Sequence, residues 1–430
     1  MSSRRRRRVR TWPIFPSSPG GRRPSSYGDQ ARDAGGRPER SRVCLVGPST
    51  LFLSGITYYT FGLAAALRSR MDVSVLFMRR LMPRRWYPGK MHVGRSITEV
   101  ALPADTPSFD GVDWFWVPSI FRAVAFLMRE RPRVVILQWW TGTVLHSYLV
   151  IAAVARLLKS RLVVEFHESL DTGEQRIPLV GSYVRSLAPR LFRAADALVV
   201  HSRFDLDLIT RAYGLPSDRF RVVPHAAGSH SPQGPIWREA PDDTCNLLCF
   251  GVIRPFKGVE DLVAAFDAIP DDEIGGYWLT VVGETWEGWT KPAEAIRRSR
   301  HRERITFVNR YVTDEEVEAV FRGADLVVLP YRRSSQSGPL HLALGFGLPV
   351  VVTRVGGLVE AVEAYAGAVL VDPHDPLALL GAIRRATGLT GRGYTSTQGW
   401  SLAADLYEKL VDELMDGPAS AEGASGRSYS

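Results

Sequence analysis

The chain has 430 residues, of which 45% are hydrophobic and 23% are charged. These proportions are typical of a globular protein with a large core, and the length allows two to three domains at roughly 150 residues each. The formal net charge of +9 lies in one segment, because residues 1–42 hold 12 arginines against three acidic residues. The remaining residues 43–430 are neutral overall, so we expect no specific nucleic-acid partner for them.

The arginine-rich segment, residues 1–42, is predicted to be a disordered tail, since it cannot bury enough apolar surface to fold. It lacks the apolar stretch of a secretory signal, and its acidic residues argue against a transit peptide. Such a tail can contact anionic lipid or nucleic acid; an over-long reading frame is an alternative explanation. Residues 417–430 are predicted to be a second disordered tail.

The three cysteines, Cys44, Cys245 and Cys249, lie in strand-like runs and have no histidine at ligand spacing. They are therefore predicted to be reduced core residues of a cytoplasmic protein. The long apolar stretch at residues 134–158 is interrupted by polar and small residues. We interpret it as a buried strand followed by a helix, not as a membrane span.

The first half of the chain alternates strand-like and helix-like segments. Strands are predicted at residues 43–47, 73–77, 134–138, 162–167, 197–202 and 220–226, and helices at about 61–70, 120–130, 144–158, 182–193 and 204–212. This alternation is typical of a doubly wound α/β domain with a mostly parallel sheet. Residues 228–243 have the Gly, Pro and polar content of an interdomain linker.

The second half repeats this architecture. Strands are predicted at residues 247–252, 278–283, 305–309, 326–331, 349–353 and 368–372, and helices at 258–268, 291–299, 314–322, 339–346, 358–364, 376–387 and 400–415. The sequence therefore predicts two Rossmann-like, doubly wound α/β domains, residues 43–235 and 236–395, with a cleft between them. Residues 396–416 are predicted to form a C-terminal helix that packs back on the first domain.

Two cations stand in a strand–turn–helix segment at residues 247–266. A short apolar strand is followed by a glycine turn that carries Arg254 and Lys257, and then by an amphipathic helix. In open α/β sheets, ligands bind at the carboxyl ends of strands, next to helix N-termini that favour anions. Two fixed cations there suit a diphosphate, although a solvated surface turn explains this stretch alone equally well.

A second strand–loop–helix segment lies at residues 326–346. The loop SSQSG leads into a helix opened by Pro339, and Ser337 or Gly338 is well placed to cap it. The amides of Gln336, Ser337 and Gly338 would then point at an anion, assisted by the helix dipole. The pair Gly356–Gly357, after the next strand, allows backbone to approach the same cleft.

These motifs together closely resemble the retaining, nucleotide-sugar-dependent glycosyltransferases of the GT-B fold, family 4 (group 1). The resemblance rests on GVIRPFKGVEDLVAAF, ADLVVLPY, SSQSG, GFGLPVVVTRVGGLVEAV and VDPHDP in the second half, and on LSGITYYTFGLAAAL, FHE, VVHSRF and VVPH in the first. It implies that Arg254 and Lys257 hold the donor diphosphate and that Ser337 and Gly338 add amide contacts. It also implies that Gly55 lets the first domain close over the phosphates.

The resemblance further implies roles for two residues beside the cleft. His167 ends a strand in VVEFHES, where this family presents a histidine near the donor sugar, although a lone histidine there is more often structural. Glu168 and His225 are weaker candidates. Glu360 follows the glycine pair and could meet sugar or ribose hydroxyls; a helix-start carboxylate favoured by the dipole explains it equally well.

The chain departs from the family pattern at three places. Many members carry two glutamates eight residues apart, and the aligned positions here are Ser334 and Leu342. Leu342 cannot bind the nucleotide ribose, so the ribose contact is unassigned. Val252 stands where an arginine is common, and Ser54 where the first loop often has a glycine. We interpret these differences as features of a subfamily with the SSQSG variant.

The resemblance implies transfer of a sugar from a nucleotide-diphosphate sugar, with retention, to a glycan, lipid-linked or small-molecule acceptor. The cations and amides would stabilise the leaving diphosphate, so neither a metal nor another cofactor is expected. The basic tail and the loop at residues 79–90 suggest peripheral contact with an anionic membrane, at its inner face. Two alternatives are a catalytically inactive scaffold and a dinucleotide-dependent oxidoreductase, but the oxidoreductase fingerprint GxGxxG is missing after the first strand.

Overall fold

The computed structural model of the protein describes residues 40–51, 55–80, 101–115, 118–168, 178–228, 230–231, 233–285 and 288–416. Both predicted tails, apart from residues 40–42, lie outside these ranges. So does the basic loop at residues 79–90 from position 81 onward.

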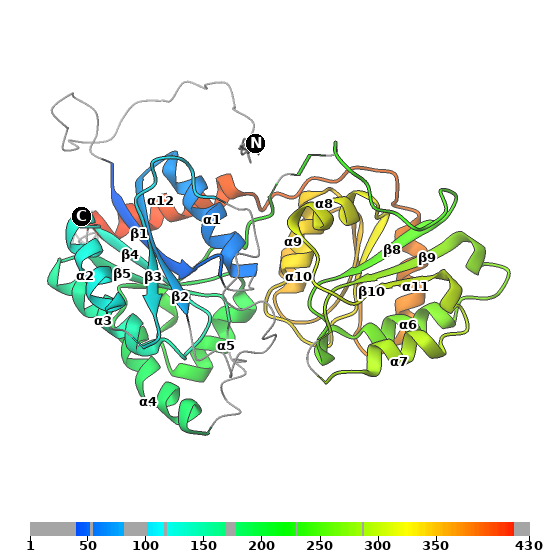
Figure 1. Ribbon diagram of the computed structural model, residues 1–430, viewed down its shortest axis with the longest axis horizontal. Coiled ribbons are helices and arrows are strands. Elements are labelled where there is room, and N and C mark those ends of the chain that lie inside the picture. Colours follow the sequence, from blue (N-terminus) through cyan, green and yellow to red (C-terminus); the bar gives the residue numbers. More distant parts are fainter. Residues whose placement is uncertain are drawn as a thin grey trace, which may run out of the picture. The chain divides into compact units, whose positions relative to one another are not determined.

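The first domain is built on a seven-stranded parallel sheet with the order β3-β2-β1-β4-β5-β6-β7 (Figure 1). Its strands are β1 (Arg42–Pro48), β2 (Asp72–Arg80), β3 (Ser108–Asp113), β4 (Val134–Trp139), β5 (Arg161–Phe166), β6 (Ala197–Val200) and β7 (Phe220–Val222). Its helices are α1 (Gly55–Arg68), α2 (Ser119–Glu130), α3 (Leu145–Leu157), α4 (Pro178–Ala194) and α5 (Arg203–Tyr213). The central strands are buried on both faces, which is why they read as continuous apolar runs.

The second domain is built on a six-stranded parallel sheet with the order β10-β9-β8-β11-β12-β13. Its strands are β8 (Cys245–Phe250), β9 (Tyr277–Val282), β10 (Ile305–Val308), β11 (Leu326–Leu329), β12 (Val350–Thr353) and β13 (Ala368–Val371). Its helices are α6 (Val259–Asp267), α7 (Lys291–Arg298), α8 (Asp314–Arg322), α9 (Gly338–Gly345), α10 (Leu358–Val362) and α11 (Pro376–Thr387). The predicted fold class, two doubly wound α/β domains, is confirmed.

Two details of the first sheet differ from the sequence prediction. The edge strand β3 was not predicted, because its sequence SFDGVD contains glycine and two aspartates, which are rare in strands. It pairs in parallel with β2 through an irregular register. The strand predicted at residues 220–226 is shorter, since β7 ends at Val222.

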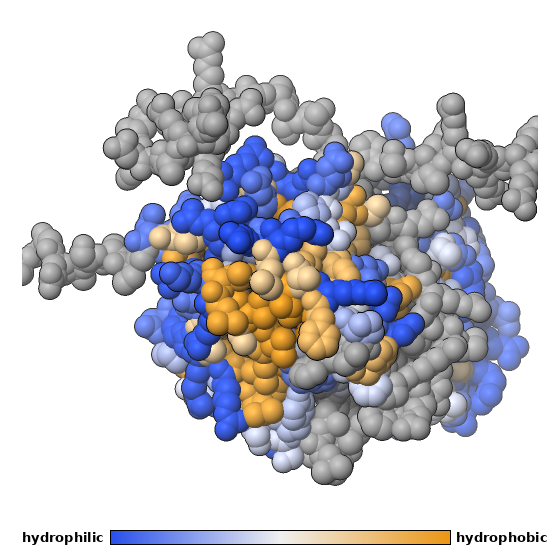
Figure 2. All heavy atoms as spheres, turned by 60° about the vertical axis from the view of Figure 1, so that its left-hand side comes forward, coloured by the Kyte–Doolittle hydropathy of each residue, from blue (hydrophilic) through white to orange (hydrophobic). Residues whose placement is uncertain are grey.

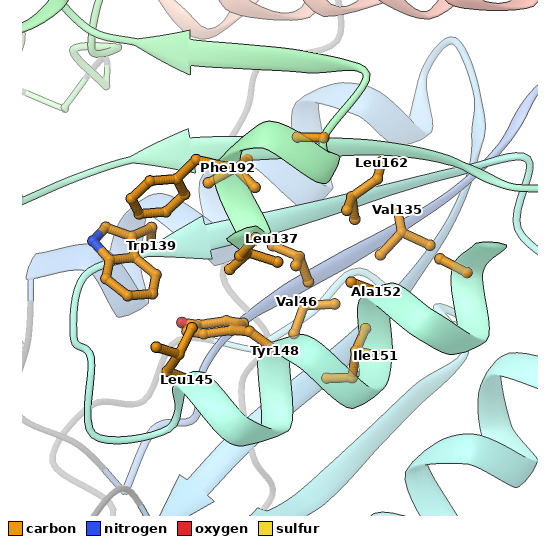
Figure 3. Packing of buried hydrophobic residues seen from close by; sticks show 14 of the residues in the cluster. Val46, Val135, Leu137, Trp139, Leu145, Tyr148, Ile151, Ala152, Leu162 and Phe192 are labelled. Atoms are coloured by element: carbon orange, nitrogen blue, oxygen red, sulfur yellow. The ribbon is translucent and has the colours of Figure 1, made fainter. Parts of the chain in front are cut away.

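Different helices cover the two faces of the first sheet. On one face, α2, α3 and α4 pack against β1, β4 and β5, and Figure 3 shows Tyr148 and Ile151 of α3 directed at this sheet. There Trp139 and Phe192 meet edge to face at 5.0 Å. The other face is covered by α1 and by the last helix, α12 (Trp400–Asp416), whose Tyr407 is fully buried. The C-terminal helix thus completes the core of the first domain.

The three cysteines are free thiols, with Cys44 and Cys249 buried and Cys245 half-buried. Burial raises the pKa of each of these thiols, to about 11 at Cys245 and about 12 at the other two. None of the helices that the structure describes combines the length and the apolar character that a membrane crossing demands.

Candidate active site

The loop after β8 carries the two predicted diphosphate ligands. Gly251 turns the chain with φ 113°, residues Pro255–Lys257 form one 3₁₀ turn, and Gly258 starts α6 with φ 65°. Both positive φ angles favour glycine. At Gly258 space is also limiting, because a Cβ atom would lie 2.0 Å from the carbonyl oxygen of Pro330. The loop is therefore pressed against the chain that leaves β11.

Lys257 lies over an aromatic ring between these two loops. Its Nζ atom is 3.8 Å from the ring centroid of Tyr331, the second residue after β11. Removal from water, helped by nearby Arg254 and opposed by Cys249 and Glu168, lowers the pKa of Lys257 to about 7. The lysine is therefore poised to gain a proton when an anion arrives.

The loop after β11 ends in a capped helix, as predicted. Ser337 is the N-cap of α9, and its Oγ atom accepts a hydrogen bond from the Leu340 amide at 3.3 Å. The same hydroxyl donates to the Tyr331 hydroxyl at 3.2 Å. Gln336 faces the first domain, where its Nε2 atom donates to Asp205 of α5 at 3.4 Å. Gly338 is the first residue of α9.

These loops meet at the point where the strand order of the second sheet reverses. From β8 the chain proceeds outward to β9 and β10, and from β11 it proceeds the other way to β12 and β13. Contact between the two loops is direct, since a Cβ atom at Gly251 would lie 3.0 Å from Pro339. Ligands of open α/β sheets bind at such a switch point. Arg254, Lys257 and the start of α9 therefore flank the position expected for a ligand.

The glycine pair after β12 packs against the SSQSG loop. A Cβ atom at Gly356, where φ is 53°, would lie 1.7 Å from the Ser334 carbonyl oxygen. Gly357 would meet the Ser335 carbonyl oxygen at 2.4 Å. Glycine is thus required here for loop packing.

Glu360 bridges the two domains. Its two carboxylate oxygens accept hydrogen bonds from the amides of Arg203 at 2.8 Å and Phe204 at 2.9 Å, the first two residues of α5. The positive end of the α5 dipole favours this carboxylate. The prediction that Glu360 meets the donor stays a prediction, but in this arrangement both oxygens already have partners.

His167 follows β5 and is buried with two other titratable residues. Its Nδ1 atom lies 3.2 Å from Nε2 of His201, and its Nε2 atom lies 3.5 Å from Oε2 of Glu165. Both ring nitrogens therefore face the protein interior, and the residue is 8% exposed. Its predicted role beside the donor sugar stays a prediction. Glu168, the next residue, is the part of the FHE motif that acts on Lys257.

Aromatic rings continue from this group into the second domain. Tyr59 contacts His167, His201 and His225, with ring centroids 4.7, 5.2 and 4.7 Å away. His225 then stacks on His341 of α9 at 4.2 Å. Burial is the largest cause that lowers the pKa of His201 to about 4 and that of His341 to about 3, and it also lowers the pKa of His225. The sequence did not predict His201, His341 or Glu165 as residues of the site. The available signal was Glu165 itself, a charged residue inside an apolar strand.

The structure thus brings only some of the predicted site residues together. Arg254, Lys257, Ser337 and Gly338 belong to two touching loops, whereas Gly55 opens α1 with no atom within 4 Å of a Cβ built on it. Leu342, aligned with a family glutamate, packs on the apolar core of the second domain. The ribose contact therefore stays unassigned.

Two family models match the chain. Residues 54–226 match a glycosyl transferase 4-like domain, and residues 244–387 match the glycosyl transferases group 1 model. Their boundary falls in the segment predicted as a linker. Together they cover most of both α/β domains.

The chain is similar to several characterised and solved proteins. It is 30% identical over 247 residues to D-inositol 3-phosphate glycosyltransferase of Xylanimonas cellulosilytica, a match that covers 51% of this chain and spans 58% of that protein. Sucrose-phosphate synthase from Thermosynechococcus elongatus has a similar fold, with a TM-score of 0.63, 17% identity and coverage of 88% of this chain and 100% of the other. HepE of Anabaena, solved in complex with UDP-glucose, gives a TM-score of 0.54 at 16% identity, with coverage of 87% and 100%.

The two solved structures establish the arrangement of two Rossmann-like domains, the GT-B fold. The family models carry the assignment further, because they match the segments that contain the switch-point loops and the FHE motif. The chain belongs to the group 1 glycosyltransferases of the GT-B fold.

Proposed function

We propose that the protein transfers a sugar from a nucleotide-diphosphate sugar to a hydroxyl acceptor with retention of anomeric configuration. The observation that carries this proposal is the meeting of the Arg254–Lys257 loop and the α9 N-terminus at the switch point of the second sheet. The family membership and the UDP-glucose complex of HepE support a uridine nucleotide sugar as the first donor to test.

Cleavage of the sugar–diphosphate bond places negative charge on the leaving oxygen. Arg254 and protonated Lys257 would meet that charge, and the amides of Ser337 and Gly338 would add hydrogen bonds from a helix N-terminus. Each such donor is worth about 3 kcal/mol of transition-state stabilisation. These groups make a metal on the diphosphate unnecessary, so we expect turnover without added Mg²⁺.

The decisive experiment is a panel of nucleotide sugars scored by released nucleoside diphosphate, with glycans, lipid-linked sugars and small polyol phosphates as acceptors. Arg254→Ala and Lys257→Ala should each lower turnover by about 10²–10³-fold. The matched control is Arg297→Ala, which removes an exposed arginine on α7 of the same domain. Equal turnover in all four proteins would refute the site assignment.

The panel also separates an enzyme from an inactive scaffold. A scaffold would bind UDP through Lys257 and release no product with any acceptor. Anomeric configuration is read from the coupling constant of the product's anomeric proton, and inversion would contradict the proposed stereochemistry.

We further propose that the acceptor is lipid-linked and that the first domain docks on an anionic membrane. Figure 2 shows an apolar area on the side of the molecule where α2 and α3 lie in Figure 1. Phe121 and Met128 of α2 are 70% and 57% exposed, and Leu157 of α3 is 83% exposed. Exposed Arg122 and Arg156 accompany them. Apolar side chains beside arginines favour the interface of anionic lipids.

Co-sedimentation with phosphatidylglycerol vesicles at low salt tests the docking. We expect the protein to bind, and the double variant Phe121→Ser, Leu157→Ser to bind at least about tenfold less. Leu377→Ser is the control, since Leu377 is 71% exposed but lies on α11 of the second domain. Deletion of residues 1–39 measures how much of the vesicle binding the arginine tail provides. If the double variant binds vesicles as well as the wild type does, or if the protein self-associates through this face, the α2–α3 surface is not the membrane-binding site.

A further inference from the structure

A buried group of three side chains in the first domain presents metal-ligating atoms to one another. Glu165 comes from β5, His167 follows the same strand, and His201 follows the neighbouring strand β6. One nitrogen or carboxylate oxygen from each lies within 4.8 Å of the others. The side chains of Glu165, His167 and His201 are 0%, 3% and 1% exposed.

The hydrogen bonds around this group leave lone pairs directed inward. Nδ1 of His201 lies 2.9 Å from the Val223 carbonyl oxygen, so it carries the proton, and the lone pair of Nε2 faces Nδ1 of His167 at 3.2 Å. Oε2 of Glu165 accepts a hydrogen bond from Gln138 at 3.1 Å. Metal-binding histidines and carboxylates are held in the same manner by backbone carbonyls and amide donors behind them.

Several polar atoms of the group have no hydrogen-bond partner among the residues that the structure describes. These are Oε1 of Glu165, Nε2 of His167 and the hydroxyls of Tyr59 and Tyr407. Such atoms are costly when buried, typically by about 1–3 kcal/mol each. His167 and the two tyrosine hydroxyls nevertheless lie close enough to interact with the Glu165 carboxylate, although without good hydrogen-bond geometry, so a cation held by that carboxylate would be within reach of all of them.

The spacing suits a small cation. Zn²⁺ binds nitrogen and oxygen at about 2.0–2.2 Å, so adjacent ligands of a tetrahedral site lie roughly 3.3 Å apart. Nε2 of His201 is 3.2 Å from Nδ1 of His167 and 3.7 Å from Oε1 of Glu165, and one ligand atom from each of the three residues lies within 4.8 Å of the other two. We propose that Glu165, His167 and His201 bind one divalent transition-metal ion of the Zn²⁺ class, with a water molecule or a tyrosine hydroxyl as fourth ligand.

Such an ion would be structural within the first domain. Its three ligands hold the ends of β5 and β6 together, and one of them, His167, precedes the residue that acts on Lys257. The proposal does not rest on the proposed function, because it concerns the occupancy of a buried site and not turnover. It is also separate from the diphosphate, for which no metal is proposed.

Metal analysis of the full, untagged chain tests this. Protein expressed in zinc-sufficient medium should contain about one zinc per chain by mass spectrometry after exhaustive dialysis. Expression in zinc-depleted, cobalt-supplemented medium should give a visible cobalt(II) ligand-field spectrum. Glu165→Gln and His201→Gln should lower the metal content from about one to near zero and abolish the cobalt bands.

The control variant is His374→Asn, which removes an exposed histidine elsewhere; asparagine tolerates the φ of 63° found there. It should keep the full metal content. Circular dichroism and thermal melting establish whether each variant folds. If a variant does not fold, the metal content of the wild-type protein still tests the proposal. Metal-free wild-type protein after growth in either medium would overturn the proposal. So would a metal content that Glu165→Gln and His201→Gln leave unchanged.

Discussion

The pKa of Lys257 predicts how donor affinity depends on pH. The free protein holds this lysine at a pKa of about 7, far below its ordinary value of 10.5, because burial and Arg254 disfavour the charge. A bound diphosphate favours the charged form. Above pH 7, binding must therefore bring a proton with it, and affinity should fall as pH rises.

The size of the effect follows from the pKa. If only the charged form binds, raising the pH from 6 to 9 should weaken binding by about 90-fold, or roughly 2.7 kcal/mol. UDP-glucose is the suitable probe, because its phosphates do not titrate in this range, as those of UDP do near pH 6. Lys257→Arg serves as control, since a guanidinium stays charged throughout.

Isothermal titration calorimetry measures both the affinity and the proton. In buffers of different ionisation enthalpy, the wild-type protein should take up close to one proton per UDP-glucose at pH 8.5, and Lys257→Arg should take up none. A wild-type affinity that stays constant from pH 6 to pH 9 would refute the reasoning. An equal decline in Lys257→Arg would assign the titration to another group.

Three further substitutions test contacts described above. Glu360→Gln weakens the carboxylate contact with the α5 amides, so urea unfolding should show a loss of about 0.5–1 kcal/mol, larger at low salt; an unchanged midpoint would contradict the contact. Gly356→Ala should lower the unfolding free energy by more than about 1 kcal/mol, because its φ is positive and a carbonyl blocks the Cβ, whereas Gly393→Ala, with open space, should not. Similar melting temperatures for both alanine variants would count against the loop packing. Tyr407→Ala removes a fully buried ring and should cost about 3–5 kcal/mol; a loss below about 1 kcal/mol would show that α12 does not complete the first core.

Much of the fold could be predicted because its strands are buried on both faces. The run Leu326–Leu329 is wholly apolar, and the helix that follows is capped by Ser337, one of the two caps that the sequence offered, so both elements were visible in the sequence with ends within about two residues of those observed. The edge strand β3 gave no such signal, since four of its six residues are polar or glycine. Hydrophobic pattern reports burial, and an edge strand is only partly buried.

The candidate site could be predicted only where one loop contains it. Arg254 and Lys257 stand three residues apart in one loop, so a common role could be proposed from the sequence alone. The partners of His167 could not be predicted, because Glu165 projects from within a strand and His201 is supplied by the neighbouring one. The contact of Glu360 with α5 depends on how two domains meet, and no local pattern encodes that geometry.

The return of α12 to the first domain has a consequence for biosynthesis. Residues that fill one face of the first sheet leave the ribosome only after the whole second domain has emerged. Although domains usually fold in order during translation, the first domain here exposes part of its apolar surface until α12 has been made. Nascent chains that stall in the second domain should therefore be clients of chaperones that shield apolar surfaces, and the emergence of α12 is the event that completes the first core.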